Sequence, residues 1–110
     1  EADKLTRAMS PMFLGGLTAR AMSLKHALKP LTFHEIYPAF FQSEIVQSIH
    51  YKVDIHLFIA ELHHKERFVL AQQPQNWHQV DALIALLIGT RHQKNRHQEI
   101  GNPAEGIIII

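Results

Sequence analysis

Apolar and polar residues alternate over the middle of the chain. From Ile49 to Ile59 every second residue is apolar, and the first residues between them are polar or charged: His50, Lys52, Asp54 and His56. A period of two is typical of a β-strand with one buried face. The polar run HHKER follows, and the apolar run RFVLA comes after it. The pattern therefore predicts a β-hairpin with strands over about 49–62 and 67–71.

The same segment also contains several residues that favour a helix. Glu61 and Lys65 stand four positions apart, as in a favourable helical ion pair, and Ala60, Leu62 and Glu66 are good helix formers. The loop between the two predicted strands has no Gly, Asn or Asp to support a tight turn. A helical segment, and with it an all-α bundle, therefore stays open as the alternative.

Helical spacing of apolar residues appears on both sides of this segment. Before it, an apolar stripe predicts an amphipathic helix that ends at Pro30, and the first-turn proline Pro38 predicts a second helix over about 36–48. The stripe comprises Leu17, Ala21, Leu24, Leu28 and Leu31.

After it, Asn76 is a suitable N-cap for a helix over about 77–90. That helix is apolar on almost every face from Ala82 to Ile88, so we expect it to lie buried across the sheet. Helices at both ends of the hairpin predict an α+β fold.

Composition predicts a single globular domain over residues 1–110. The chain is 46% hydrophobic and 19% charged, and its longest apolar run, at 82–89, is far too short for a membrane span. The absence of cysteine excludes disulfides and thiolate chemistry and leaves the compartment undetermined, so a cytoplasmic location is only the default. Pro11, Gly15 and Gly16 argue against a signal peptide. Since the chain starts at Glu1 without Met, we expect a processed form or a fragment.

Positive charge is clustered although the net charge is only +1. A basic N-terminal arm (residues 1–31) has no acid between Lys4 and His34, and a second group of cations follows the last helix, in a polar C-terminal tail (residues 92–110). Clustered cations bind nucleic acid by displacing counterions from phosphates. The candidate nucleic-acid-binding residues are Arg20, Lys25, Lys29, Arg91, Lys94 and Arg96.

The nine histidines do not predict a metal site. No two of them are separated by two, three or four positions, which are the spacings that present a chelating pair on one strand or one helix. A site assembled across elements would use His56, His63 and His64, and these remain weak candidates. We therefore expect no metal and no cofactor.

Apolar residues lie close to both ends of the chain. The segment SPMFLGG suits docking on a partner, and four exposed isoleucines at the C-terminus would aggregate unless they pair as an added strand or bury in a partner. A lone hairpin is marginal, whereas a homodimer completes a larger sheet. The candidate partner-binding residues are Met12, Phe13, Leu14, Ile107, Ile108, Ile109 and Ile110.

No nucleophile elbow, phosphate-binding Gly-rich loop or metalloprotease helix motif occurs in the sequence. The sequence therefore predicts a small binding domain that is not an enzyme and acts through protein contacts, as a homodimer. The first alternative is a nucleic-acid-binding protein that uses the two basic clusters. The second is a His-dependent hydrolase or metal-binding protein.

Overall fold

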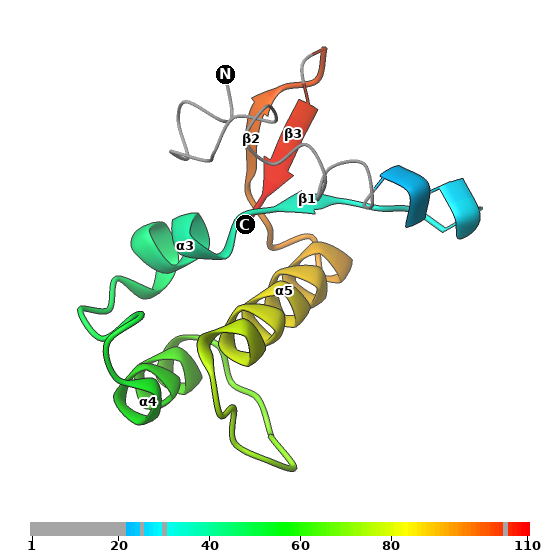
Figure 1. Cartoon of the computed structure of the whole chain (residues 1–110). Coiled ribbons are helices and arrows are strands. Elements are labelled where there is room, and N and C mark those ends of the chain that lie inside the picture. The colour runs from blue at the N-terminus through cyan, green and yellow to red at the C-terminus, as the bar shows by residue number, and fades with distance from the viewer. Residues whose placement is uncertain (1–21, 25, 30, 105) are drawn as a thin grey trace.

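Helices and a small mixed sheet form the part of the chain that the structure describes. The computed structural model describes residues 22–24, 26–29, 31–104 and 106–110. The elements, in chain order, are β1 (Glu35–Ile36), α3 (Pro38–Phe41), the π-helix η1 (Gln42–Val46), α4 (Ile55–Lys65), α5 (Trp77–Gln93), β2 (Glu99–Asn102) and β3 (Gly106–Ile109). The predicted α+β class is confirmed. Figure 1 shows α5 running from the α4 side of the molecule to the sheet.

The second predicted helix is confirmed as the continuous pair α3 and η1. Pro38 stands in its first turn, where a missing amide hydrogen costs nothing. The helix ends at Gln47, which adopts a left-handed backbone conformation with φ 58°. Phe41 and Val46 point from this pair into the core.

The predicted hairpin is wrong. Residues 55–65 form helix α4, and residues 67–71 have no strand partner. The side chain of Asp54 accepts a hydrogen bond from the backbone N–H of Leu57 at 3.0 Å, which caps the helix. Phe58, Ile59 and Leu62 are buried at helical spacing. Apolar residues occur at both parities here, so the pattern fitted strand and helix alike, and the Asp54 cap with one-sided burial selects the helix.

The last predicted helix is confirmed as α5. Asn76 caps it by accepting a hydrogen bond from the Gln79 N–H at 2.9 Å. Its buried residues are Val80, Leu83, Ile84, Leu87 and Ile88. The expectation that it lies buried across the sheet is wrong, because it packs against α3 and α4 and leaves Leu86 67% exposed.

Beyond residue 98, the predicted polar C-terminal tail is folded into strands. Strands β2 and β3 form an antiparallel hairpin, and β1 pairs in parallel with β3, so the sheet order is β1-β3-β2. Ile108, Ile109 and Ile110 are at most 3% exposed. The backbones of Gln98 and Ile110 exchange hydrogen bonds of 2.7 and 2.9 Å, which holds the end of the chain on the sheet. The sequence left two possibilities for these isoleucines, an added strand or burial in a partner, and in the structure they form an added strand.

Residues 17–21 and 25 of the predicted N-terminal helix lie outside the described residues. Where it is described, residues 22–24 and 26–27 are helical, and Leu24 and Leu28 are 54% and 41% exposed. These leucines therefore belong to no core within the described part of the chain. The core is instead built from α3, η1, α4, α5 and the end of β3.

Candidate functional site

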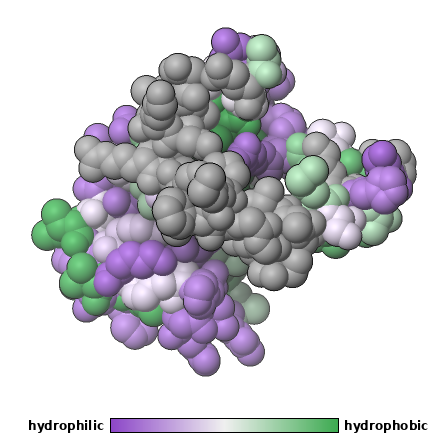
Figure 2. All heavy atoms as spheres, turned by 45° about the horizontal axis from the view of Figure 1, so that its top comes forward, coloured by the Kyte–Doolittle hydropathy of each residue, from purple (hydrophilic) through white to green (hydrophobic). Residues whose placement is uncertain are grey.

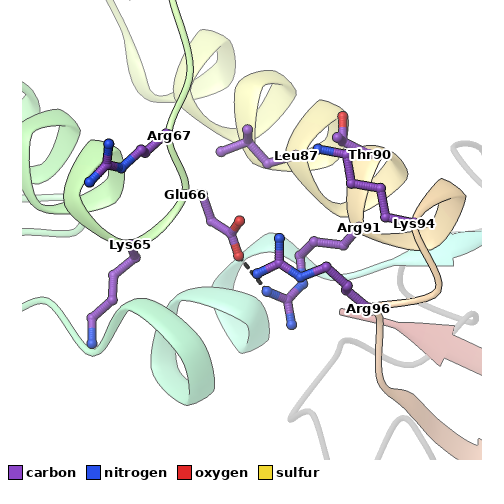
Figure 3. A pocket seen from close by; sticks show the side chains of 8 residues that line it. All are labelled: Lys65, Glu66, Arg67, Leu87, Thr90, Arg91, Lys94 and Arg96. Atoms are coloured by element: carbon purple, nitrogen blue, oxygen red, sulfur yellow. Dashed lines mark hydrogen bonds and ion pairs between the residues drawn. The ribbon is translucent and has the colours of Figure 1, made fainter.

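A cationic pocket of about 310 Å³ lies where the C-terminal ends of α4 and α5 approach each other. Figure 3 shows its lining side chains on the end of α4, the last turns of α5 and the loop that follows α5. The lining residues are Lys65, Glu66, Arg67, Leu87, Thr90, Arg91, Lys94 and Arg96. Five of them are cations and one is a carboxylate. We call this the cationic pocket.

Arg91 is held in place before any ligand binds. Its guanidinium donates to the carboxylate of Glu66, and both side chains are only 11% exposed. The guanidinium also lies 5.7 Å from the centre of the Phe41 ring, within the range of a cation–π contact. Its Nε atom is buried without a hydrogen-bond partner. Arg91 is therefore a fixed positive charge at the base of the pocket.

Arg96 reaches the same place because the chain turns back after α5. Asn95 adopts a left-handed conformation with φ 55°, and the N–H of Arg96 donates to the carbonyl of Arg91 at 2.8 Å. In Figure 3 the side chains of Arg91 and Arg96 point toward Glu66, whereas Lys65 and Arg67 point away from it. The pocket thus has an arginine pair beside the carboxylate and lysine and arginine side chains at its edge.

The pocket keeps a positive excess after every opposing charge is counted. Glu66 cancels one cation, and the C-terminal ends of two helices each carry a partial negative charge of about one half. Five cations therefore leave an excess of about three positive charges. That excess attracts an anion. It is larger than the positive charge needed to compensate the negative ends of the two helix dipoles.

The structure brings together only part of the predicted nucleic-acid-binding set. Arg91, Lys94 and Arg96 share the cationic pocket, and Lys29 is exposed in the segment before β1. Arg20 and Lys25 lie outside the described residues. Lys65 and Arg67 also line the pocket, although the alternating pattern predicted Lys65 in a hairpin loop and Arg67 at the start of the return strand. The spacing of Lys65 from Glu61 was the signal that could have placed them at a helix end.

Some of the predicted partner-binding residues also lie outside the described part of the chain, and the others are placed by the structure. Met12, Phe13 and Leu14 lie outside the described residues. The isoleucines at 107–110 belong to β3 and the core beneath it. In the folded chain they are not a free surface for a partner.

The histidines of α4 do not converge. His56, His63 and His64 are all exposed, and only His56 and His63 border a common groove, with Phe68 and Val69. The His63 ring contacts Phe68 edge-on at 5.1 Å. Within the described ranges no group of three or more His, Asp or Glu side chains is arranged to hold a metal ion.

Glu61, on α4, pairs with a histidine from outside the helix and not with its neighbour His63. Glu61 accepts a hydrogen bond from His50 Nδ1 at 2.7 Å instead. A hydrogen bond from Ser48, and then the one from His50, lower the pKa of Glu61. Because Ser48 is hydrogen-bonded to the carboxylate and not to the imidazole, this trio lacks the base that would activate a serine nucleophile.

Tyr51 joins the start of α4 to α5. Its hydroxyl donates to Asp81 at 2.6 Å, and the amino group of Lys52 binds the other oxygen of Asp81 at 3.1 Å. Burial, followed by the hydrogen bond and charge of Asp81, raises the pKa of Tyr51. The ring of Tyr51 packs against Phe58 and Trp77, so these aromatic residues belong to the packing between α4 and α5.

Three other histidines meet beside the last turn of α5. The ring centre of His92 lies 4.1 Å from that of His34 and 4.5 Å from that of His97. Burial lowers the pKa of His92 first, and the neighbouring His34 and His97 lower it further. His34, His92 and His97 form what we call the histidine cluster. Residues 34 and 92 are far apart in the sequence, so no linear spacing could have revealed it.

No protein-family model, curated protein or solved structure matches the chain. Function must therefore be argued from the site alone. Among the described residues, none of the helices combines the length and apolar character that a bilayer crossing requires. Figure 2 shows one face of the molecule, on which hydrophilic side chains surround small separate groups of hydrophobic ones.

Proposed function

We propose that this chain is a small non-enzymatic binding domain that binds the phosphate backbone of a nucleic acid at the cationic pocket. The observation that carries the proposal is a pocket lined by five cations and a single carboxylate, in which Arg91 and Arg96 point toward the carboxylate and the other cations stand around them. Surface cations on a single helix usually serve as solvated charge, whereas these come from the end of α4, the end of α5 and the loops that follow both helices. The homodimer predicted from the sequence remains a separate proposal.

The geometry of the arginines supports phosphate as the ligand group. A guanidinium presents its N–H donors in a planar fork that matches two oxygens of a phosphate. Arg91 is already immobilised by Glu66 and Phe41, so little of its side-chain entropy is left to lose on binding. Lys94 and Arg96 are exposed and free to follow the ligand.

The lining also predicts what kind of recognition takes place. None of the residues around the pocket is aromatic, so the pocket offers no ring on which a base could stack. Contacts to phosphate position a protein without carrying sequence information. We therefore expect binding that tolerates any base sequence.

The test is fluorescence anisotropy with a mixed-sequence duplex and a single strand over a series of salt concentrations. With three or four phosphates neutralised, the logarithm of the association constant should fall with the logarithm of salt concentration with a slope of about −3. Replacing Lys94 and Arg96 together by alanine should weaken binding about tenfold or more at low salt and make the slope shallower by about 2.

Lys52→Ala is the matched control, because it removes a cation that pairs with Asp81 and does not line the pocket. It should change affinity much less than the double variant. Because the control removes one cation and the double variant two, a free-energy loss in the control of half or more of that in the double variant would mean that net charge and not the pocket drives binding. No binding at low salt would also refute the proposal. Lys29→Ala tests separately whether the described part of the basic arm contributes.

A further inference from the structure

Two histidines of the cluster are sequence neighbours of arginines that line the cationic pocket. His92 follows Arg91 in the last turn of α5, and His97 follows Arg96 in the next loop. Consecutive Cα atoms are about 3.8 Å apart, so the backbones of these histidines adjoin the pocket, and we take about 10 Å as the working distance from an imidazole to a bound phosphate, slightly more than the Debye length of about 8 Å at physiological salt. His34 completes the cluster from the segment before β1.

We propose that the histidine cluster couples phosphate binding at the cationic pocket to proton uptake, so that the chain binds nucleic acid more tightly as the pH falls from about 7.5 to 5.5. This inference rests on the proposed function and specifies how the same site is regulated. It needs no new contact between the histidines and the ligand. The coupling acts through the charge that the imidazoles gain.

The geometry disfavours a charge on His92 when no ligand is bound. Burial lowers the pKa of His92, and the tilted rings of His34 and His97 lie against it, so a positive charge on either neighbour would repel a proton on His92. The Nδ1 atom of His97 is buried without a hydrogen-bond partner. His92 is therefore a site that can take up a proton when a negative charge is added nearby.

The charged groups that act on His92 come from each segment around it. They are His34 before β1, His97 in the loop after α5, and Glu99 on β2. Only Glu99 favours a proton, and its carboxylate lies 3.8 Å from Nε2 of His97. Strand β3 contributes glycine and isoleucines, which carry no charge. Together these groups disfavour a proton on His92 until another negative charge is present.

A bound phosphate supplies that negative charge. At a separation of about 10 Å, one charge changes the proton affinity of an imidazole about two- to seventeenfold as the effective dielectric constant varies between about 80 and 20, and screening by salt at about 0.01 M lowers the upper value to about eightfold. Linkage requires protonation to strengthen phosphate binding by the same factor. We therefore expect the dissociation constant to fall about two- to eightfold on acidification, beyond the general effect of the other histidines.

The first experiment follows the histidine resonances of the full chain by NMR during pH titrations, with and without a mixed-sequence oligodeoxynucleotide. The expected result is that the titration midpoint of His92 or His97 rises in the presence of the oligonucleotide. If the oligonucleotide binds at pH 8 and none of the three midpoints rises, the coupling is refuted while the proposed function stands. If it does not bind at pH 8 and low salt, the proposed function fails and the coupling fails with it.

The second experiment measures affinity by anisotropy at pH 8 and pH 5.5 in two triple variants. One replaces the cluster, with His34→Gln, His92→Gln and His97→Gln, and the control replaces His26, His56 and His78, which are exposed and outside the pocket. The cluster variant should bind like the wild type at pH 8 and lose most of the acid-dependent gain, and the control should keep it. Equal losses in both variants, or weaker wild-type binding at pH 5.5, would overturn the coupling.

Should the cluster variant fail to fold, as judged by circular dichroism, the titration of the wild-type chain still decides the question.

Discussion

At the scale of single residues, a few polar side chains determine the local structure. Asp54 begins α4, Asn76 begins α5, and Pro38 stands in the first turn of α3. The roles of Asn76 and Pro38 were predicted from the sequence, because capping residues act through bonds to their immediate neighbours. The role of Asp54 was missed, because its place in an alternating pattern assigned it to the wet face of a strand.

The cap at Asp54 predicts a loss of stability on its removal. Asp54→Ala leaves the N–H of Leu57 without its partner, so the free energy of unfolding should fall by about 1 kcal/mol. Asp54→Asn keeps an oxygen that accepts the bond and should change stability much less. Urea denaturation followed by circular dichroism measures both. Equal losses in the two variants would contradict the capping role.

The buried hydroxyl of Tyr51 predicts a sensitivity to alkaline pH. Folding raises the pKa of Tyr51 above its ordinary value of 10.0, so the unfolded chain ionises first as the pH increases. The stabilisation is therefore complete below about pH 10 and is lost progressively above it. In urea denaturation at a series of pH values, Tyr51→Phe should flatten this decline. A decline of unchanged steepness in the variant would assign it to other groups.

At the scale of elements, burial decides between structures that a local pattern allows equally. Residues 49–62 satisfy the period of a strand, yet Val53 is 75% exposed and Leu57 49% exposed, while Phe58 and Leu62 are fully buried. The alternation would have placed Leu57 on the buried face with Val53. The helix instead directs Phe58, Ile59 and Leu62 toward η1 and α5. The local pattern of apolar residues does not predict this packing.

The two described glycines with contrasting surroundings make a matched test of element geometry. Gly106 has φ 117° at the start of β3, and a Cβ atom there would meet only a carboxylate oxygen of Glu35 at 3.9 Å. Gly106→Ala should therefore cost about 1 kcal/mol or more through backbone strain alone. Gly89 lies within α5 with nothing within 4 Å of such an atom, so Gly89→Ala should stabilise the chain by about 1 kcal/mol.

Thermal and urea denaturation of these two variants measure the expected decrease and the expected increase in the free energy of unfolding. If Gly106→Ala were neutral, the left-handed conformation at the start of β3 would not be required. If Gly89→Ala destabilised the chain, the exposed side of α5 would have a packing partner.

At the scale of the whole molecule, the C-terminal isoleucines are buried in the core of this chain and do not form an exposed surface for a partner. Ile109 and Ile110 join the buried cluster formed by α3, η1, α4 and α5, so the sheet and the helices share a single core. The homodimer was inferred from exposed isoleucines and a lone hairpin, and neither is present in the described part of the chain. Self-association stays a proposal that light scattering decides over a range of concentrations. A dimer gives a mass near twice 12.6 kDa that falls on dilution, and a constant mass of 12.6 kDa excludes it.

The sequence by itself determined the features that depend on neighbouring residues. These are the two helices observed over 38–46 and 77–93, Pro38 and Asn76 at their starts, and the grouping of Arg91, Lys94 and Arg96 within one helix end and its loop. Each follows from hydrogen bonds, prolines or charges within a few positions of one another. The α+β class was predicted correctly, but from a hairpin that is absent, whereas the observed sheet pairs segments that are far apart in the sequence.

Only the tertiary structure decided the features that join distant segments. Lys65 and Arg67 line the same pocket as Arg91 and Arg96 because the C-terminal ends of α4 and α5 border it, and His34 contacts His92 across a long stretch of sequence because β1 pairs with β3. The helix over 55–65 belongs with them, since the burial of its Phe58 and Leu62 requires the other helices to be present. Contacts between distant residues depend on how the faces of helices and sheets pack together. The pattern of apolar residues shows which face of an element is buried, but not which other element covers it.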